Sequence, residues 1–258
     1  MAKPLDWQAL LVDGYEPLRK AQRVFRRLPS DPRCQLCRNP FGGWGGRLAG
    51  LMGRRPSRKN PNLCQYCFDH LPSGGMEIDI GVVFADVRSS TALGERTSAT
   101  EFAARLNRFY AQATDVLIRH DGVVDKLIGD AVMALFFGGF AGPEYRRRTA
   151  EAALDLAASV TDLPVGVAAN AGTAFVGTVG SGSVLDFTAL GDAVNVGARL
   201  QAEASPGEVV MAAALYDLVA ADHPGAILRT VAVRGRQEPV DVAILGAAGS
   251  STAPSPRP

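Results

Sequence analysis

Two aspartates stand where a pair of divalent metal ions could be bound. Asp86 follows an apolar run that begins at residue 78, and Asp130 ends the segment Lys126-Leu-Ile-Gly-Asp130. Carboxylates and phosphate oxygens are the ligands that Mg²⁺ prefers, and two such ions can activate a nucleophile beside a phosphate. Ser89, Ser90 and Thr91 follow Asp86 and offer hydroxyls and backbone N–H groups to a phosphate. These residue types indicate metal-assisted chemistry on a phosphorylated substrate.

Four cysteines form a second candidate site. Cys34 and Cys37 are separated by two residues, as are Cys64 and Cys67, and 26 residues lie between the two pairs. Four thiolates with this spacing typically bind Zn²⁺ tetrahedrally, so we expect a structural zinc ion. An iron–sulfur centre and free, redox-active thiols are the alternatives, and His70 could replace one thiolate.

The apolar periodicity predicts the elements that position these groups. Strands are expected at residues 78–87, 123–128, 131–137 and 165–169, and helices at 98–121, 143–159 and 191–204. Residues 173–186 resemble a long β-hairpin arm. The order strand, helix, strand, strand, helix, strand predicts an α+β fold of the ferredoxin-like βαββαβ type. In such a sheet the strand that ends at Asp86 lies beside the hairpin that carries Asp130.

Local signals support these boundaries. Ser98 and Glu101 have the spacing of a capping box at the start of a helix. Gly129 with the following aspartate is typical of a hairpin turn. At the N-terminus, an amphipathic pattern predicts a helix that Gly14 and Pro17 divide into two short pieces.

Three segments in this order resemble the catalytic domain of class III nucleotidyl cyclases. They are Phe84-Ala-Asp-Val with the following Thr91, Lys126-Leu-Ile-Gly-Asp130, and Thr188-Ala-Leu-Gly-Asp-Ala-Val-Asn195-Val-Gly-Ala-Arg199. Each segment is modest alone, but the three together, in order and correctly spaced, are specific. The resemblance covers residues 76–247, and the threonine at position 188 is typical of a bacterial subgroup.

The resemblance implies a role for each matched residue. Asp86 and Asp130 would bind two Mg²⁺ or Mn²⁺ ions, and Lys126 and Thr188 would contact the purine. Asn195 and Arg199 would orient the ribose and stabilise the transition state. In this family one chain supplies the metal ligands and its partner supplies the other residues. The resemblance therefore implies a homodimeric adenylyl cyclase that converts ATP to cyclic AMP and pyrophosphate.

The chemistry of the side chains agrees with these roles. Lys126 donates hydrogen bonds, which suits N1 of adenine, an acceptor, and disfavours N1 of guanine, a donor. Asn195 and Arg199 are four residues apart and share one face of a predicted helix. Two departures from the family pattern stand out. Ser89 and Ser90 replace the usual Gly-Phe, and residue 170 is asparagine in a region where histidine is common.

Three other functions compete with the adenylyl cyclase hypothesis. A guanylyl cyclase is disfavoured by Lys126. A cyclase-like module that senses nucleotide without turnover would be expected to lack one of the matched residues, and none is lost. The third is a zinc-ribbon protein that binds nucleic acid through the arginines near the cysteines. We expect these arginines to be solvated and assign no nucleic-acid binding to them.

Composition and charge divide the 258 residues unequally. Residues 1–75 hold 13 Lys and Arg against 5 Asp and Glu, and the remainder holds 14 against 21. This asymmetry predicts either a basic segment that docks on its own acidic domain or one that binds an external partner.

The expected organisation is an N-terminal amphipathic helix (1–30), a Cys-rich zinc-ribbon-like module (31–75), the catalytic domain (76–247) and a disordered tail (248–258). Without an apolar membrane-length run or signal core, the chain is expected to be cytoplasmic, with no membrane partner.

Overall fold

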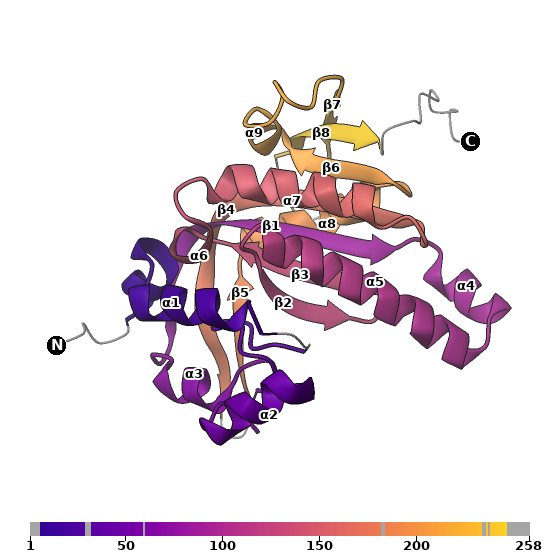
Figure 1. Cartoon of the computed structure of the whole chain (residues 1–258). Coiled ribbons are helices and arrows are strands. Elements are labelled where there is room, and N and C mark those ends of the chain that lie inside the picture. The colour runs from indigo at the N-terminus through magenta and orange to yellow at the C-terminus, as the bar shows by residue number, and fades with distance from the viewer. Residues whose placement is uncertain are drawn as a thin grey trace.

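A single mixed β-sheet organises the chain. The computed structural model describes residues 6–28, 32–58, 60–181, 184–233, 236 and 238–246. Within them the strands follow the order β2-β3-β1-β4-β6-β8-β7, and β5 pairs with β4 beyond this path (Figure 1). The strands are β1 Gly75–Val87, β2 Val123–Ile128, β3 Ala131–Phe136, β4 Val165–Ser181, β5 Val184–Leu190, β6 Glu208–Ala212, β7 Ile227–Val231 and β8 Val240–Gly246.

Helices occupy the connections between these strands. They are the π-helix η1 Ala9–Asp13, α1 Glu16–Phe25, α2 Gly43–Leu51, α3 Gln65–His70, α4 Ser90–Arg96, α5 Ala99–Arg119, α6 Gly138–Ala141, α7 Tyr145–Ser159, α8 Asp192–Glu203 and α9 Ala213–Tyr216. The predicted α+β order of strands and helices is confirmed. No helix in the described ranges is long and apolar enough to cross a lipid bilayer.

Strand β1 lies at the centre of the sheet because its run of β-branched residues is buried on both faces. It pairs antiparallel with β3 on one side and with β4 on the other. In the first of these pairs, Asp86 lies opposite Ala131. Because Gly129 adopts a positive φ of 62°, the β2–β3 hairpin turns tightly there. The end of β1 and the tip of the hairpin therefore meet.

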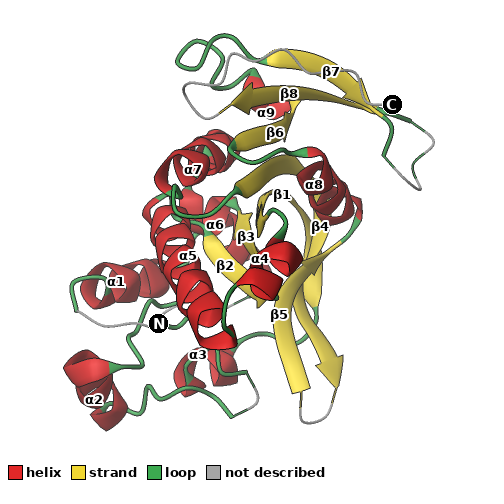
Figure 2. Cartoon of the chain, turned by 90° about the vertical axis from the view of Figure 1, so that its right-hand side faces the viewer, coloured by secondary structure: helices red, strands yellow, loops and turns green. Residues whose placement is uncertain are grey.

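Helices α5 and α7 cover one face of the sheet, and α8 covers the other (Figure 2). Ser98 caps α5 by accepting a hydrogen bond from the backbone N–H of Glu101 at 3.2 Å, which confirms the predicted start of this helix. The core between α5, α7 and the sheet contains Phe109, Leu117, Phe136 and Leu156, each fully buried. This packing fixes the positions of β1 and the hairpin.

The N-terminal segment packs against the β-sheet. Gly14, with φ of 85°, separates η1 from α1, so the predicted division into two short helices is confirmed. Leu10 and Leu11 share a buried cluster with Ile80 of β1, and Trp7 stacks on Phe187 of β5 at 6.1 Å between ring centroids. Residues on both sides of position 75 thus contribute to one continuous core.

Charge complements this apolar contact. Arg26, which follows α1, forms an ion pair with Asp121 at 2.5 Å, and Arg38 donates to the carbonyl of Gly122. The basic segment is therefore docked on its own chain, the first of the two arrangements that its charge predicted.

The Gly-rich helix α2 was not predicted, and between the cysteine pairs the described backbone forms helix and isolated bridges. The predicted tail at 248–258 lies outside the described residues.

Candidate functional site

The two predicted metal ligands lie side by side. The backbone N–H of Val87 donates to the carbonyl of Asp130 at 3.2 Å, which places the hairpin tip against the end of β1. Burial and the neighbouring Asp130 carboxylate raise the pKa of Asp86, while Arg88, at 3.8 Å from Asp86 Oδ2, acts against this shift. Two carboxylates that repel each other in a partly buried position are suited to a divalent cation with hard oxygen ligands.

A hollow of about 320 Å³ opens beside this pair. It is lined by Asp130 and Gly129 of the hairpin, by Ser90, Thr91 and Gly94 of α4, and by Phe102 and Leu106 of α5. Ser89 precedes α4 with φ of 56°, a left-handed conformation that glycine adopts more readily. Ser89 therefore holds a backbone conformation that would suit the glycine expected here from the sequence resemblance.

The two predicted purine-contacting residues also come together. Lys126 on β2 forms an ion pair with Asp186 on β5, and its Nζ lies 3.9 Å from Asp125 Oδ2. Thr188, two residues after Asp186, donates from Oγ1 to Asp125 Oδ2 at 2.8 Å. One cluster of four side chains therefore joins β2 to β5, and Lys126 and Thr188 both belong to it.

Two members of this cluster, Asp125 and Asp186, were missed by the sequence analysis. Asp125 is 1% exposed, and burial raises the pKa of its carboxyl to about 6. The sequence did contain a signal for Asp125. Aspartate is depleted in strands, and alternation places residue 125 on the same buried face as Val123. Asp186 and Thr188 likewise alternate on one side of β5.

Asn195 and Arg199 lie on helix α8, four residues apart, and both are exposed. The predicted shared helix face is confirmed. In the part of the chain that the structure describes, neither side chain contacts Asp86, Asp130, Lys126 or Thr188 through a hydrogen bond or ion pair. A single chain thus presents three separate groups: the aspartate pair, the β2–β5 cluster and the exposed asparagine–arginine pair.

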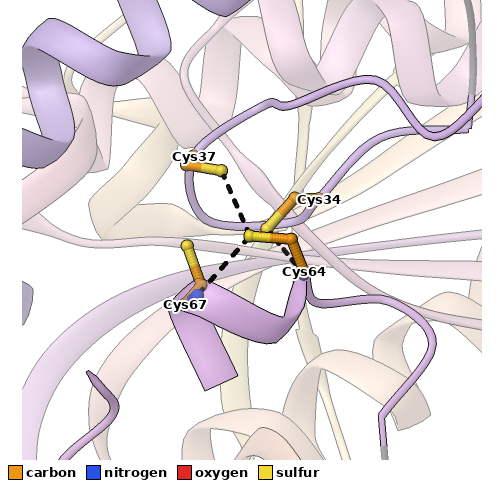
Figure 3. A group of neighbouring side chains, drawn as sticks. All are labelled: Cys34, Cys37, Cys64 and Cys67. Carbon is orange, nitrogen blue, oxygen red and sulfur yellow. Dashed lines mark hydrogen bonds between the residues drawn. The ribbon is translucent and has the colours of Figure 1, made fainter. Parts of the chain in front are cut away.

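The four cysteines converge on one point. Their Sγ atoms all lie within 4.8 Å of one another, and all four residues are buried (Figure 3). Hydrogen bonds with the three neighbouring thiols lower the pKa of Cys64 and raise that of Cys67. His70 lies apart from this group, since its Nδ1 contacts the Tyr66 carbonyl and its ring stacks on Tyr66. The chemistry of four buried thiols fits a thiophilic metal ion.

Comparison with known families decides the class of the catalytic region. Residues 76–246 match the family described as the adenylate and guanylate cyclase catalytic domain. The chain belongs to this family. The cyclase fold that the sequence resemblance implied is thereby confirmed.

Solved structures share the architecture of this cyclase domain. The guanylyl cyclase Cya2 superimposes with a TM-score of 0.61 at 22% identity, covering 68% of this chain and 95% of that one. The adenylyl cyclase CyaB from P. aeruginosa gives a TM-score of 0.57 at 24% identity, covering 66% and 95%. The fold is therefore common to cyclases of both purine specificities.

Two relatives in Mycobacterium tuberculosis extend the likeness beyond the cyclase domain. The uncharacterized protein Rv1319c is 30% identical over 248 residues, which is 91% of this chain and 43% of the relative. The uncharacterized protein Rv1320c is 32% identical over 201 residues, or 76% and 33%. The chain spans less than half the length of these relatives.

Proposed function

We propose that the chain is an adenylyl cyclase that forms 3′,5′-cyclic AMP and pyrophosphate from ATP at the interface of a homodimer. The observation that carries this proposal is the β2–β5 cluster, which gathers Lys126 and Thr188 into one place. An ammonium group donates to N1 of adenine and meets a competing N–H donor at N1 of guanine. The cluster therefore favours ATP over GTP.

Asp86 and Asp130 would hold two Mg²⁺ or Mn²⁺ ions in this proposal. When bound, these ions neutralise the triphosphate and make the ribose 3′-hydroxyl more acidic. Ser90 and Thr91, which line the adjoining hollow, offer hydroxyls to the phosphates, and Ser89 starts the turn that presents them. The raised pKa of Asp86 predicts that protons compete with the cations at this position.

The remaining residues act on the reacting atoms. The 3′-oxygen attacks the α-phosphorus, the bond from this phosphorus to the bridging oxygen of pyrophosphate breaks, and the hydroxyl proton passes to solvent. Asn195 would orient the ribose so that its 3′-oxygen faces the phosphorus. The planar guanidinium of Arg199 would stabilise the negative charge that develops on the phosphoryl oxygens.

The separation of the groups supports a site shared by two chains. Among the described residues, the lining of the hollow beside the aspartate pair includes none of Lys126, Thr188, Asn195 and Arg199. Leu127, Ile128 and Leu190, sequence neighbours of the functional residues, are large apolar side chains with 49–55% of their surface exposed. A second copy that covers them would also bring its own Asn195 and Arg199 to the metal ligands.

The cysteine cluster is proposed to hold one structural Zn²⁺ ion. Cys34, Cys37, Cys64 and Cys67 supply four thiolates, the ligand set of closed structural zinc sites. Elemental analysis of the purified protein should find about one zinc atom per chain. Iron together with visible absorption would instead identify an iron–sulfur centre, and absence of both metals would contradict the proposal.

A turnover assay with ATP and GTP, in the presence of Mg²⁺ or Mn²⁺, tests the cyclase function directly. We expect cyclic AMP to be the main product. Arg199→Ala should lower turnover by about 10²–10³, the usual scale for one transition-state donor. Faster cyclisation of GTP would make the protein a guanylyl cyclase, and ATP binding without product would make it a nucleotide sensor.

A further inference from the structure

Strand β2 carries a bulge at Asp125. Val124 pairs with Ala134 of β3 and Lys126 pairs with Met133, so Asp125 is an extra residue without a partner in the ladder. A bulge interrupts the regular alternation of side chains along a strand and is frequent beside active sites. Here Asp125 keeps the buried face of Val123, and its carboxylate reaches across to β5, where it accepts a hydrogen bond from the Thr188 hydroxyl at 2.8 Å.

The N-terminal module holds this bulge in place. Gln35, which lies between Cys34 and Cys37, donates from Nε2 to the carbonyls of both Val124 (2.7 Å) and Asp125 (2.8 Å). Because β2 is the edge strand, carbonyls that do not pair with β3 need another donor, and Gln35 supplies it to these two. The bulge is therefore fixed from both sides, by Gln35 at the backbone and by Thr188 at the side chain.

The direction of the Thr188 hydrogen bond has a consequence for ligand recognition. A hydroxyl has one proton and two lone pairs, and an ionised carboxylate accepts hydrogen bonds only. When the Thr188 hydroxyl donates its hydrogen bond to Asp125, the hydroxyl oxygen can offer only lone pairs to a ligand. We infer that Asp125 is a positioning residue that makes Thr188 a hydrogen-bond acceptor and thereby sets the preference of the site for adenine over guanine.

The two purines differ at the atom in question. The exocyclic group of adenine is an N6 amino donor, whereas guanine presents the O6 acceptor at the same place on the ring. A Thr188 oxygen limited to lone pairs therefore suits adenine and opposes guanine. This inference rests on the proposed function, because it assumes that the purine edge is read by Lys126 and Thr188.

The charged neighbours of Asp125 keep this arrangement in place. Lys126 lies 3.9 Å from its Oδ2, and Asp186 on β5 neutralises part of the lysine charge. Oδ1 of Asp125 is buried without a hydrogen-bond partner in the described structure. Burial raises the pKa of this carboxyl to about 6, so it is ionised at pH 8 and largely protonated at pH 5. Once protonated, Asp125 no longer has to accept a hydrogen bond from the Thr188 hydroxyl.

The test is Asp125→Asn, assayed for binding and turnover of ATP and GTP. Asparagine has the same shape but offers both a donor and an acceptor, so it leaves the Thr188 hydroxyl free to donate to guanine O6. We expect the ratio of kcat/KM for ATP to that for GTP to fall about tenfold, the effect of one mismatched hydrogen bond. The ratio of dissociation constants for fluorescent ATP and GTP analogues should fall similarly.

Thr188→Val gives the decisive comparison. If Asp125 acts through the Thr188 hydroxyl, adding Asp125→Asn to the Thr188→Val chain should change the ratio less than twofold. Asp115→Asn, which alters an exposed carboxylate on α5, should leave the ratio as in the unaltered protein. An unchanged ratio in Asp125→Asn, or an equal fall in the Thr188→Val background, would overturn the inference.

Two further results keep the test independent of folding and of the cyclase proposal. If Asp125→Asn fails to fold, the unaltered protein is used, and its ATP preference in binding should weaken between pH 8 and pH 5. A preference that is constant over this range would contradict the role of Asp125. If the unaltered protein cyclises neither nucleotide, the proposed function fails, while the binding ratios still decide whether Asp125 sets purine selectivity.

Discussion

At the scale of single residues, Asp125 shows that a functional arrangement can oppose stability. Its pKa rises from an ordinary 3.8 to about 6 on burial, so the folded chain binds this proton more tightly than the unfolded chain. The stability that this group contributes is complete below pH 3.8 and is lost as pH rises through about 6. The shift of about two pKa units corresponds to roughly 3 kcal/mol.

Asp125→Asn removes this titration, so its effect on stability should depend on pH. We expect the free energy of unfolding of the variant, relative to the unaltered protein, to rise between pH 4 and pH 7 by up to roughly 3 kcal/mol. Urea unfolding at four or five pH values measures this difference. A difference that stays constant over the whole range would mean that Asp125 is not held ionised against burial.

Some residues of the candidate site could be identified from the sequence, and others could not. Asp86, Asp130, Lys126 and Thr188 could be found because their residue types and spacing define a motif. The partners of Lys126 could not, since they depend on the bulge in β2 and on contacts between strands far apart in the chain. Long-range pairing of this kind leaves only a weak local signal, such as a carboxylate on a buried strand position.

At the scale of elements, the edge of the sheet is the place where the cysteine module and the cyclase domain meet. Edge carbonyls that do not pair with another strand need hydrogen-bond donors, and Gln35 supplies two hydrogen bonds to β2. Gln65 occupies the equivalent position after Cys64, but its amide contacts the exposed Asp69. The two glutamines therefore form a matched pair for mutation.

Gln35→Ala should loosen the bulge, whereas Gln65→Ala should not. Loss of two hydrogen bonds to buried carbonyls is expected to lower the free energy of unfolding by about 1–3 kcal/mol. Amide hydrogen exchange in β2 should become faster, and binding of ATP should weaken because Lys126 and Thr188 lose their fixed geometry. Equal effects of the two substitutions would show that the contact at the sheet edge has no special importance.

Prediction of the elements succeeded where local signals were strong. The capping box at Ser98, the turn at Gly129 and the β-branched run of β1 are each decided by neighbouring residues. Helix α2 was missed because glycine disfavours helices, and its sequence contains several glycines. The docking of the N-terminal segment was predicted only as one of two arrangements, since charge asymmetry alone does not identify the partner surface.

At the scale of the whole molecule, the shared core predicts that the cysteine site supports the cyclase domain. Cys34, Cys37, Cys64 and Cys67 belong to the same buried cluster as Ile80 and Phe187. Removing the proposed zinc ion should therefore lower the thermal stability of the complete chain in one transition, not melt the module alone. Calorimetry before and after metal removal by a chelator measures this, and an unchanged main transition would contradict it.

The proposal that two chains share each active site can be tested with two variants that are inactive on their own. Asp86→Ala removes a metal ligand and Arg199→Ala removes a transition-state donor, so each homodimer should be inactive. In a mixed dimer one of the two sites combines the intact halves of both chains, and random mixing should restore about a quarter of full activity. Mixing Asp86→Ala with Asp130→Ala is the matched control, because both lesions then fall in the same half and no site is complete. Equal activity of the two mixtures, with mixed dimers demonstrated by native mass spectrometry, would mean that each chain works alone.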